Sequence, residues 1–217
     1  NSRPDLLGST GTTRADAATD LQRDAYEQAA AALDSLDAGD EQVRAQVLFT
    51  HQEGERTISF GNYVAETYLS LAEADRASWP AEYQEMTPVA LAGGVGELAA
   101  GEVTRGMLID ALPAPERLQL ALVTGDMYAE LLDSGLVTET YTDSLTSASI
   151  PDGQMLLVTD SGTLRSLTDQ SYTVLRDYGD AFWCVRMAIN DATGGFTEAF
   201  VLPEAPRYGV GRGDVTG

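Results

Sequence analysis

Carboxylates are abundant in this sequence, whereas imidazole and thiol groups are rare and lysine amines are missing. Its 217 residues include 34 Asp and Glu against one histidine and one cysteine, and all 13 basic residues are arginines. Two carboxylates can serve as the acid and the base of a hydrolase, and Glu82 with Glu85 is one candidate pair. In a chain this acidic such pairs are common, so nothing distinguishes these two residues. The sequence therefore predicts no catalytic residue, and a carboxylate-based hydrolase ranks last among three functional hypotheses.

The other groups that catalyse reactions or hold cofactors are nearly missing from the sequence. His51 lies beside Gln52 and Glu53 and is expected to be an exposed loop residue, so a histidine-dependent triad or a histidine-rich metal site is excluded or severely limited. The absence of lysine excludes a phosphate-binding Gly-Lys loop and Schiff-base chemistry. Cys184 cannot form an internal disulfide and is expected to fill the core. We therefore expect no cofactor and no metal.

The excess of acidic over basic residues gives a formal net charge of −21. This charge argues against specific nucleic-acid binding, which needs clustered Lys and Arg, and against binding to an anionic membrane surface. The sequence has no run of about 18 apolar residues, so no transmembrane helix is expected. The acidic, lysine-free composition fits a protein from a halophilic host that must stay solvated in concentrated salt, or a high-GC genome that encodes Arg in place of Lys.

The spacing of apolar residues predicts an α+β fold, in which helical patterns dominate first and strand patterns later. The predicted segments are an N-terminal arm and helix (1–40), an extended loop or β-hairpin followed by a helix (41–87), a central α/β segment (88–150), a C-terminal antiparallel sheet packed on a helix (151–206) and a tail (207–217).

Several elements within these segments are predicted in more detail. Residues 43–60 predict a hairpin that turns at Gly54, and Val95 to Leu112 predict a long helix. Residues 118–135 predict a strand, a turn and a short helix. The strands of the C-terminal sheet are predicted in five runs, QMLLVTD, TLRSL, SYTVLRDY, AFWCVRMAIN and GFTEAFVLP. In the fourth run apolar residues such as Trp183 and Val185 alternate.

Three stretches resemble a known fold when they are taken in order. They are LQLALVTGDMYAELLDSG (118–135), DGQMLLVTDSGTLRSL (152–167) and YTVLRDYGDAFWCVRMAINDATGGFTEAFVLPEAP (172–206). They resemble a strand, turn and short helix, then a strand pair, then the closing strands of the subunit fold shared by tailed-virus major capsid proteins and encapsulins. The resemblance implies an N-terminal arm and an extended loop that reach neighbouring subunits. A start at Asn1 would suit the proteolytic trimming of that family, whereas its Lys-to-Asn isopeptide bond cannot form here.

The leading hypothesis is therefore a structural, non-enzymatic capsid subunit of a virus or virus-like particle. It would self-assemble as a homo-oligomer in the virion shell, where it could also contact other virion proteins. It would bind neither a specific nucleic acid nor a membrane. The candidate subunit-contact residues are Trp79, Tyr83, Phe60 and Phe200. The alternative is a monomeric, acidic, secreted or cell-surface binding module that contacts a ligand near Trp79 and Tyr83.

Overall fold

The structure, a computed structural model, describes residues 41–52, 58–135, 137–142, 153–169, 171–204 and 210–211. For residues 137–142 and 210–211 it describes the backbone alone. Within these residues it confirms the α+β class, because helices and two sheets alternate along the chain. The predicted arm and helix of residues 1–40, and the turn at Gly54, lie outside the described residues. The five segment boundaries stay a prediction.

The larger sheet has six strands, in the order β7-β4-β6-β2-β5-β9. Strands β6 and β2 pair in parallel, and the other neighbours pair antiparallel, so the sheet is mixed. The bounds of the six strands are β2 Val89–Gly93, β4 Arg117–Thr124, β5 Val137–Thr142, β6 Gln154–Asp160, β7 Thr173–Asp180 and β9 Val210–Gly211.

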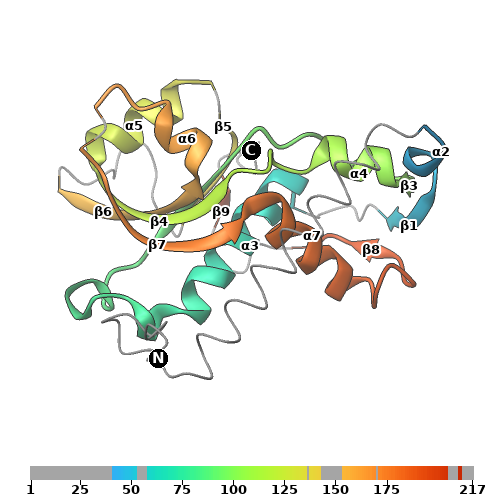
Figure 1. The fold of residues 1–217 in the computed structure, drawn as a ribbon, viewed down its shortest axis with the longest axis horizontal. Helices are drawn as coiled ribbons and strands as arrows, with labels where there is room; N and C mark the ends of the chain where they lie inside the picture. The colour runs from blue at the N-terminus through green and yellow to red at the C-terminus, as the bar shows by residue number, and fades with distance from the viewer. Residues whose placement is uncertain are drawn as a thin grey trace, which may run out of the picture.

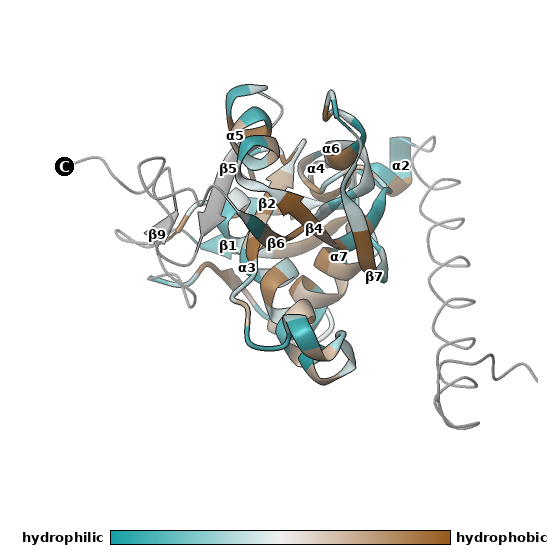
Figure 2. Cartoon of the chain, turned by 90° about the vertical axis from the view of Figure 1, so that its left-hand side faces the viewer, coloured by the Kyte–Doolittle hydropathy of each residue, from teal (hydrophilic) through white to brown (hydrophobic). Residues whose placement is uncertain are grey.

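Helices cover both faces of this sheet (Figure 1). Helices α5 (Gly125–Asp133) and α6 (Ser161–Arg165) contribute to one core with Ala121 and Val123 of β4. Helices α3 (Phe60–Ala74) and α7 (Ala181–Ala192) contribute to the other core, with Leu118, Leu120 and Leu122 of the same strand. The alternation of β4 side chains between the two cores is what a strand buried on both faces requires. Figure 2 shows this apolar strand between the helical layers.

The smaller sheet has three strands, in the order β3-β1-β8. Its strands are β1 (Val47–Gln52), β3 (Gly101–Thr104) and β8 (Phe200–Val201), and it lies at the opposite end of the molecule from α5 and α6 (Figure 1). The short helices α2 (Glu41–Arg44) and α4 (Arg105–Ala111) lie beside it. Two 3₁₀ turns, η1 (Arg76–Ser78) and η2 (Ala81–Tyr83), connect α3 to β2.

Four strands run directly into helices, and the last residue of each strand caps the helix that follows. Asp160 accepts a hydrogen bond from the backbone N–H of Thr163 at 2.8 Å, and Asp180 accepts one from Trp183 at 3.0 Å. Thr104 and Thr124 cap α4 and α5 in the same way. A side-chain oxygen at this position satisfies one of the amides that a helix N-terminus leaves unpaired, and so ends the strand and starts the helix in one residue.

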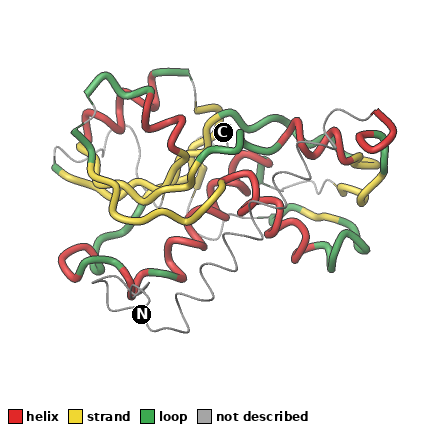
Figure 3. Tube along the Cα trace, in the orientation of Figure 1, coloured by secondary structure: helices red, strands yellow, loops and turns green. Residues whose placement is uncertain are grey.

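Two predicted strands are helices in the structure (Figure 3). AFWCVRMAIN forms α7, and TLR of TLRSL belongs to α6. The prediction for α7 was wrong because its apolar residues also fit a helical period: Phe182, Val185 and Ile189 are three and four residues apart, and all are buried. The capping aspartates that precede both helices were the missed signals.

The predicted hairpin and the long helix at 95–112 were also wrong. Strand β1 pairs with β3 and β8, whereas a hairpin partner would have ended at Phe60, which is the first residue of α3. The helix starts only at Arg105. Gly101 has φ +112°, which no helical residue adopts, and Thr104 caps the helix from the end of β3. The predictions of α3, β4, α5, β6 and β7 were confirmed.

Candidate functional site

Five aromatic rings form one connected cluster between the smaller sheet and the start of α3. Phe49 of β1 contacts Phe200 of β8 edge to face, with the ring centroids 5.8 Å apart, and Phe200 contacts Tyr63 in the same manner at 5.2 Å. Tyr63 stacks on Phe60 at 6.2 Å. Phe196 completes the set by lying nearly parallel to Phe49, with centroids 5.8 Å apart and an angle of 11° between the planes. We call these five residues the aromatic cluster.

Phe196 has the most unusual backbone among the described residues. Its φ is +63°, and no other non-glycine residue of the described ranges has a positive φ. For a bulky L-residue this left-handed conformation is strained by about 1–2 kcal/mol. Strain of this kind persists only where surrounding contacts over-determine it, and it concentrates at ligand-binding and catalytic sites. The conformation therefore marks Phe196 as a candidate functional residue.

The loop that follows α7 holds Phe196 in place. Thr193 is fully buried, and its Oγ1 accepts a hydrogen bond from the Phe196 backbone N–H at 3.0 Å. The carbonyl of Thr193 accepts from the N–H groups of Thr197 and Glu198, both at 2.9 Å. Gly194 and Gly195 supply two further positive φ angles, +57° and +79°. We call residues 193–198 the Phe196 loop.

The Phe196 ring is only partly buried, while Phe49 and Phe200 beside it are buried. Part of an apolar ring is thus presented to solvent by a backbone that cannot easily turn it inward. An aromatic ring in this position can stack against a planar group, such as a nucleic-acid base, through dispersion and ring electrostatics. The chemistry that this site offers best is recognition, because four of the five side chains of the aromatic cluster are phenylalanines and none is a carboxylate.

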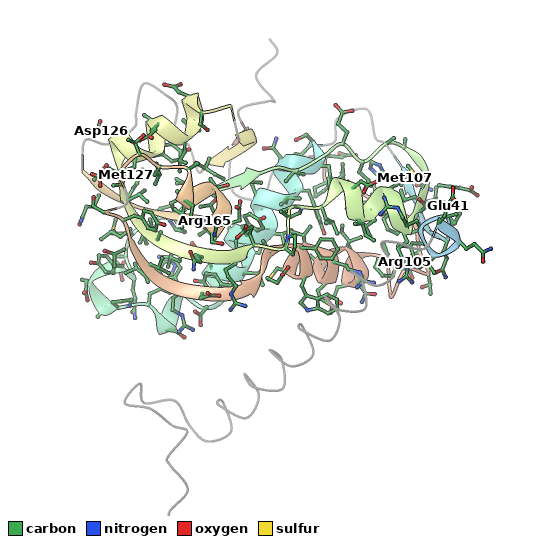
Figure 4. The ribbon with its side chains drawn as sticks, turned by 45° about the horizontal axis from the view of Figure 1, so that its top comes forward. Glu41, Arg105, Met107, Asp126, Met127 and Arg165 are labelled. Atoms are coloured by element: carbon green, nitrogen blue, oxygen red, sulfur yellow. The ribbon has the colours of Figure 1, made fainter. Side chains whose placement is uncertain are left out.

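A second candidate, the charged junction, lies where β4 begins. The Ser161 hydroxyl donates to Glu116 at 2.6 Å, and Arg165 donates to the other oxygen of the same carboxylate at 2.6 Å. A serine, a carboxylate and an orienting group resemble the parts of an activated nucleophile. However, the hydrogen bonds from Arg165 and then Ser161 lower the pKa of Glu116, so this carboxylate is a poor proton acceptor. The charged junction therefore fastens α6 to β4. Figure 4 labels Arg165 there, between Asp126 and Met127 at one end of the molecule and Arg105 and Met107 at the other.

A third candidate is the buried phenol of Tyr68, near the capping residues Asp160 and Asp180. Burial raises the pKa of Tyr68 well above its usual value, and the charges of Asp160, Cys184 and Asp180 raise it further. Burial also raises the pKa of Asp180. Clusters of perturbed groups often mark active sites. Here both carboxylates are already used as helix caps. The Tyr68 hydroxyl has no hydrogen-bond partner among the described residues, but it is fully buried, so no ligand reaches it from solvent.

The four predicted subunit-contact residues lie mostly inside the protein. Phe60, Trp79 and Phe200 are buried, and Tyr83 is half-buried against the same core. The Trp79 indole donates to the Tyr178 hydroxyl at 3.1 Å, and the Arg76 guanidinium covers its ring at 4.8 Å. Subunit contact by these residues stays a prediction, although burial limits the surface that they could offer.

The structure also shows where the remaining candidate residues from the sequence lie. His51 was expected to be exposed, but it is buried in β1, with Nδ1 3.3 Å from the carbonyl of Ala99 and its ring against Phe200. Glu82 and Glu85 are exposed residues near η2 and form no site. Cys184 is partly buried, and its thiol donates to the Tyr178 carbonyl at 3.6 Å. Phe196 itself was missed, although Gly194 and Gly195 just before it signalled an unusual turn.

Metal binding and membrane spanning are the two remaining properties of the described residues. No three His, Cys, Asp or Glu side chains among them are grouped so that they could hold a metal ion. No helix in that part of the chain has the length and apolar character needed to cross a membrane.

The comparisons with known proteins give partial matches to solved structures. No protein-family model and no curated protein matches the sequence. One similar structure is a 5′-nucleotidase precursor from Thermus thermophilus, with 13% identity and a TM-score of 0.45, covering 76% of this chain and 41% of that chain. Another is a putative 5′-nucleotidase from Staphylococcus aureus in complex with alpha-ketoglutarate, with 12% identity and a TM-score of 0.44, covering 74% and 42%. This chain thus spans about two fifths of their length.

The capsid-subunit interpretation is wrong. The stretch 172–206, which was expected to supply closing strands, instead contains α7 and a β8 of two residues, so the pattern that carried the resemblance is not the pattern of the fold. The two structural neighbours are 5′-nucleotidases and not capsid or encapsulin subunits, and both are named as enzymes. The expectations of a virion protein and of a non-enzymatic chain are corrected with it. The neighbours give no support to the secreted or cell-surface binding module either.

Proposed function

We propose that this chain is the substrate-recognition part of an enzyme, and that it holds a planar aromatic group of the substrate against the exposed part of Phe196. The observation that carries the proposal is the left-handed backbone of Phe196 at φ +63°. A strained conformation must be maintained by the rest of the fold, and here it keeps an apolar ring partly in solvent.

The aromatic cluster supports this role because it makes the Phe196 ring rigid. Phe49 lies parallel to one side of the ring, and Phe49 is itself fixed by Phe200. A ring that is already in position loses little conformational freedom when a ligand stacks on it, so more of the stacking energy appears as affinity. Of the three candidate sites, this is the one that presents part of an apolar ring to solvent.

A 5′-nucleotide is the first ligand to test, because it joins a planar base to a phosphate ester and its fragments separate stacking from phosphate binding. Nucleotides are also the compound class in the names of the two neighbours. Binding of AMP, adenosine and ribose 5-phosphate is measured by calorimetry in molar KCl. We expect AMP and adenosine to bind and ribose 5-phosphate, which lacks the ring, not to bind. Phe196→Leu should weaken adenosine binding roughly 5- to 150-fold, the range that loss of one base–aromatic stack gives.

Tyr172→Leu is the matched control, because Tyr172 is a partly buried aromatic residue that packs against the other core, beside α5 and α6. It should leave the affinity for adenosine unchanged. The proposal fails if neither AMP nor adenosine binds, if Phe196→Leu binds adenosine as the wild type does, or if ribose 5-phosphate binds equally well.

A further inference from the structure

We infer that Thr193 is the positioning residue of this site, which fixes the Phe196 ring in its binding orientation before the ligand arrives. The inference rests on the proposed function, and it adds the source of the orientation. Thr193 does not touch a ligand in this scheme. It acts through the backbone of Phe196, by hydrogen bonds that lie wholly within the Phe196 loop and the last turn of α7.

The Thr193 hydroxyl forms hydrogen bonds in both directions. Oγ1 donates to the carbonyl of Ile189 at 2.8 Å, which ties it to α7, and accepts from the Phe196 N–H at 3.0 Å, which ties it to the loop. Thr193 is fully buried, so water cannot replace either bond. The hydroxyl is therefore a bridge between a rigid helix and the one strained residue among the described ranges that is not glycine.

Removing the hydroxyl should release the backbone strain at Phe196. The N–H of Phe196 would lose its acceptor, and φ +63° would lose one of the contacts that maintain it. The ring would then sample several orientations. When only a fraction of molecules presents the ring correctly, the apparent affinity falls by that fraction.

The test uses Thr193→Val, which keeps the shape of the side chain but removes the hydroxyl, and Thr193→Ser, which restores it. Thr159→Val is the matched control, because Thr159 is also fully buried and its Oγ1 donates to the carbonyl of Leu91 at 2.8 Å, in the larger sheet. Each variant of the full chain is measured for adenosine affinity, for chymotrypsin cleavage after Phe196 by mass spectrometry, and for unfolding in urea.

We expect Thr193→Val to bind adenosine roughly 3- to 10-fold more weakly, in line with the loss of the one hydrogen bond that reaches Phe196. Its cleavage after Phe196 should be faster, Thr193→Ser should restore both properties, and Thr159→Val should change neither. The inference is overturned if Thr193→Val binds as the wild type while Phe196→Leu does not, or if Thr159→Val weakens binding equally.

The failure of the inference and that of the proposed function have different signatures. If adenosine does not bind the wild type, or if Phe196→Leu has no effect, the recognition role is lost. Cleavage after Phe196 still tests the positioning, because it needs no ligand. Unchanged cleavage in Thr193→Val would then refute the positioning as well.

Discussion

Replacing Asp160 with alanine should lower the free energy of unfolding by about 2–4 kcal/mol. The carboxylate is buried and accepts two hydrogen bonds from Thr163, one from the backbone N–H at 2.8 Å and one from the hydroxyl at 2.7 Å. Loss of an N-cap side chain costs about 1 kcal/mol. The buried Thr163 hydroxyl would also be left without its acceptor, which costs about 1–3 kcal/mol more.

The assay is urea unfolding at one fixed KCl concentration, followed by circular dichroism. Thr104→Ala is the reference, because Thr104 caps α4 through a single hydrogen bond, from the N–H of Met107 at 3.2 Å, and should cost only about 1 kcal/mol. Thr163→Val in the Asp160→Ala background should cost less than Thr163→Val alone, since the hydroxyl has already lost its partner. An equal loss in Asp160→Ala and Thr104→Ala would refute the reasoning.

Three further predictions concern alkaline stability, packing and acid stability. Burial raises the pKa of Tyr178 to about 12 from 10.0, so an unfolded chain ionises first and stability should fall as pH rises between these values; Tyr178→Phe should reduce the slope in pH-dependent urea unfolding. Gly106→Ala should lower the free energy of unfolding by up to about 2 kcal/mol, because a Cβ at this position would lie 3.2 Å from the Arg44 carbonyl oxygen. This overpacking outweighs the gain in helix propensity. A higher urea midpoint in Gly106→Ala would contradict the prediction. Arg165 and Ser161 hold the pKa of Glu116 below its usual 4.5, so the stability that this carboxylate contributes above pH 4.5 is lost as pH falls through the lowered pKa. In Glu116→Gln the melting temperature should therefore fall less steeply with decreasing pH in this acid range.

The sequence predicted those elements whose periodicity and end signals agree. In β4 and α5 the alternating leucines, the Thr124 cap and the stop at Gly135 all indicate one strand and one helix. In AFWCVRMAIN the two periods compete, because Trp183 and Val185 alternate while Phe182 and Val185 are three residues apart. Only the capping side chain of Asp180 decides between them, and its role was not recognised.

The candidate site could not be predicted from the sequence, for a different reason. Gly194 and Gly195 indicate a turn, but the positive φ of Phe196 depends on the buried Thr193 hydroxyl and on contact with Phe49, which is distant in sequence. His51 was misplaced in the same way, since its burial depends on pairing with the last strands. Residues that are defined by long-range contacts leave little mark on local patterns.

The parallel pairing of β1 with β8 has a consequence for the order in which the protein assembles. His51 is paired with Phe200, and the Ile58 N–H donates to the carbonyl of Pro203 at 2.9 Å, so early and late parts of the described chain meet here. During synthesis β1 emerges long before β8 exists, and such distant pairings form slowly. Five of the six strands of the larger sheet precede β8 in the chain, so they can pair before the residues that cover Phe49 have been made. The proposed recognition would then be acquired late, after most of the larger sheet, and a chain that is cut before β8 would lack it.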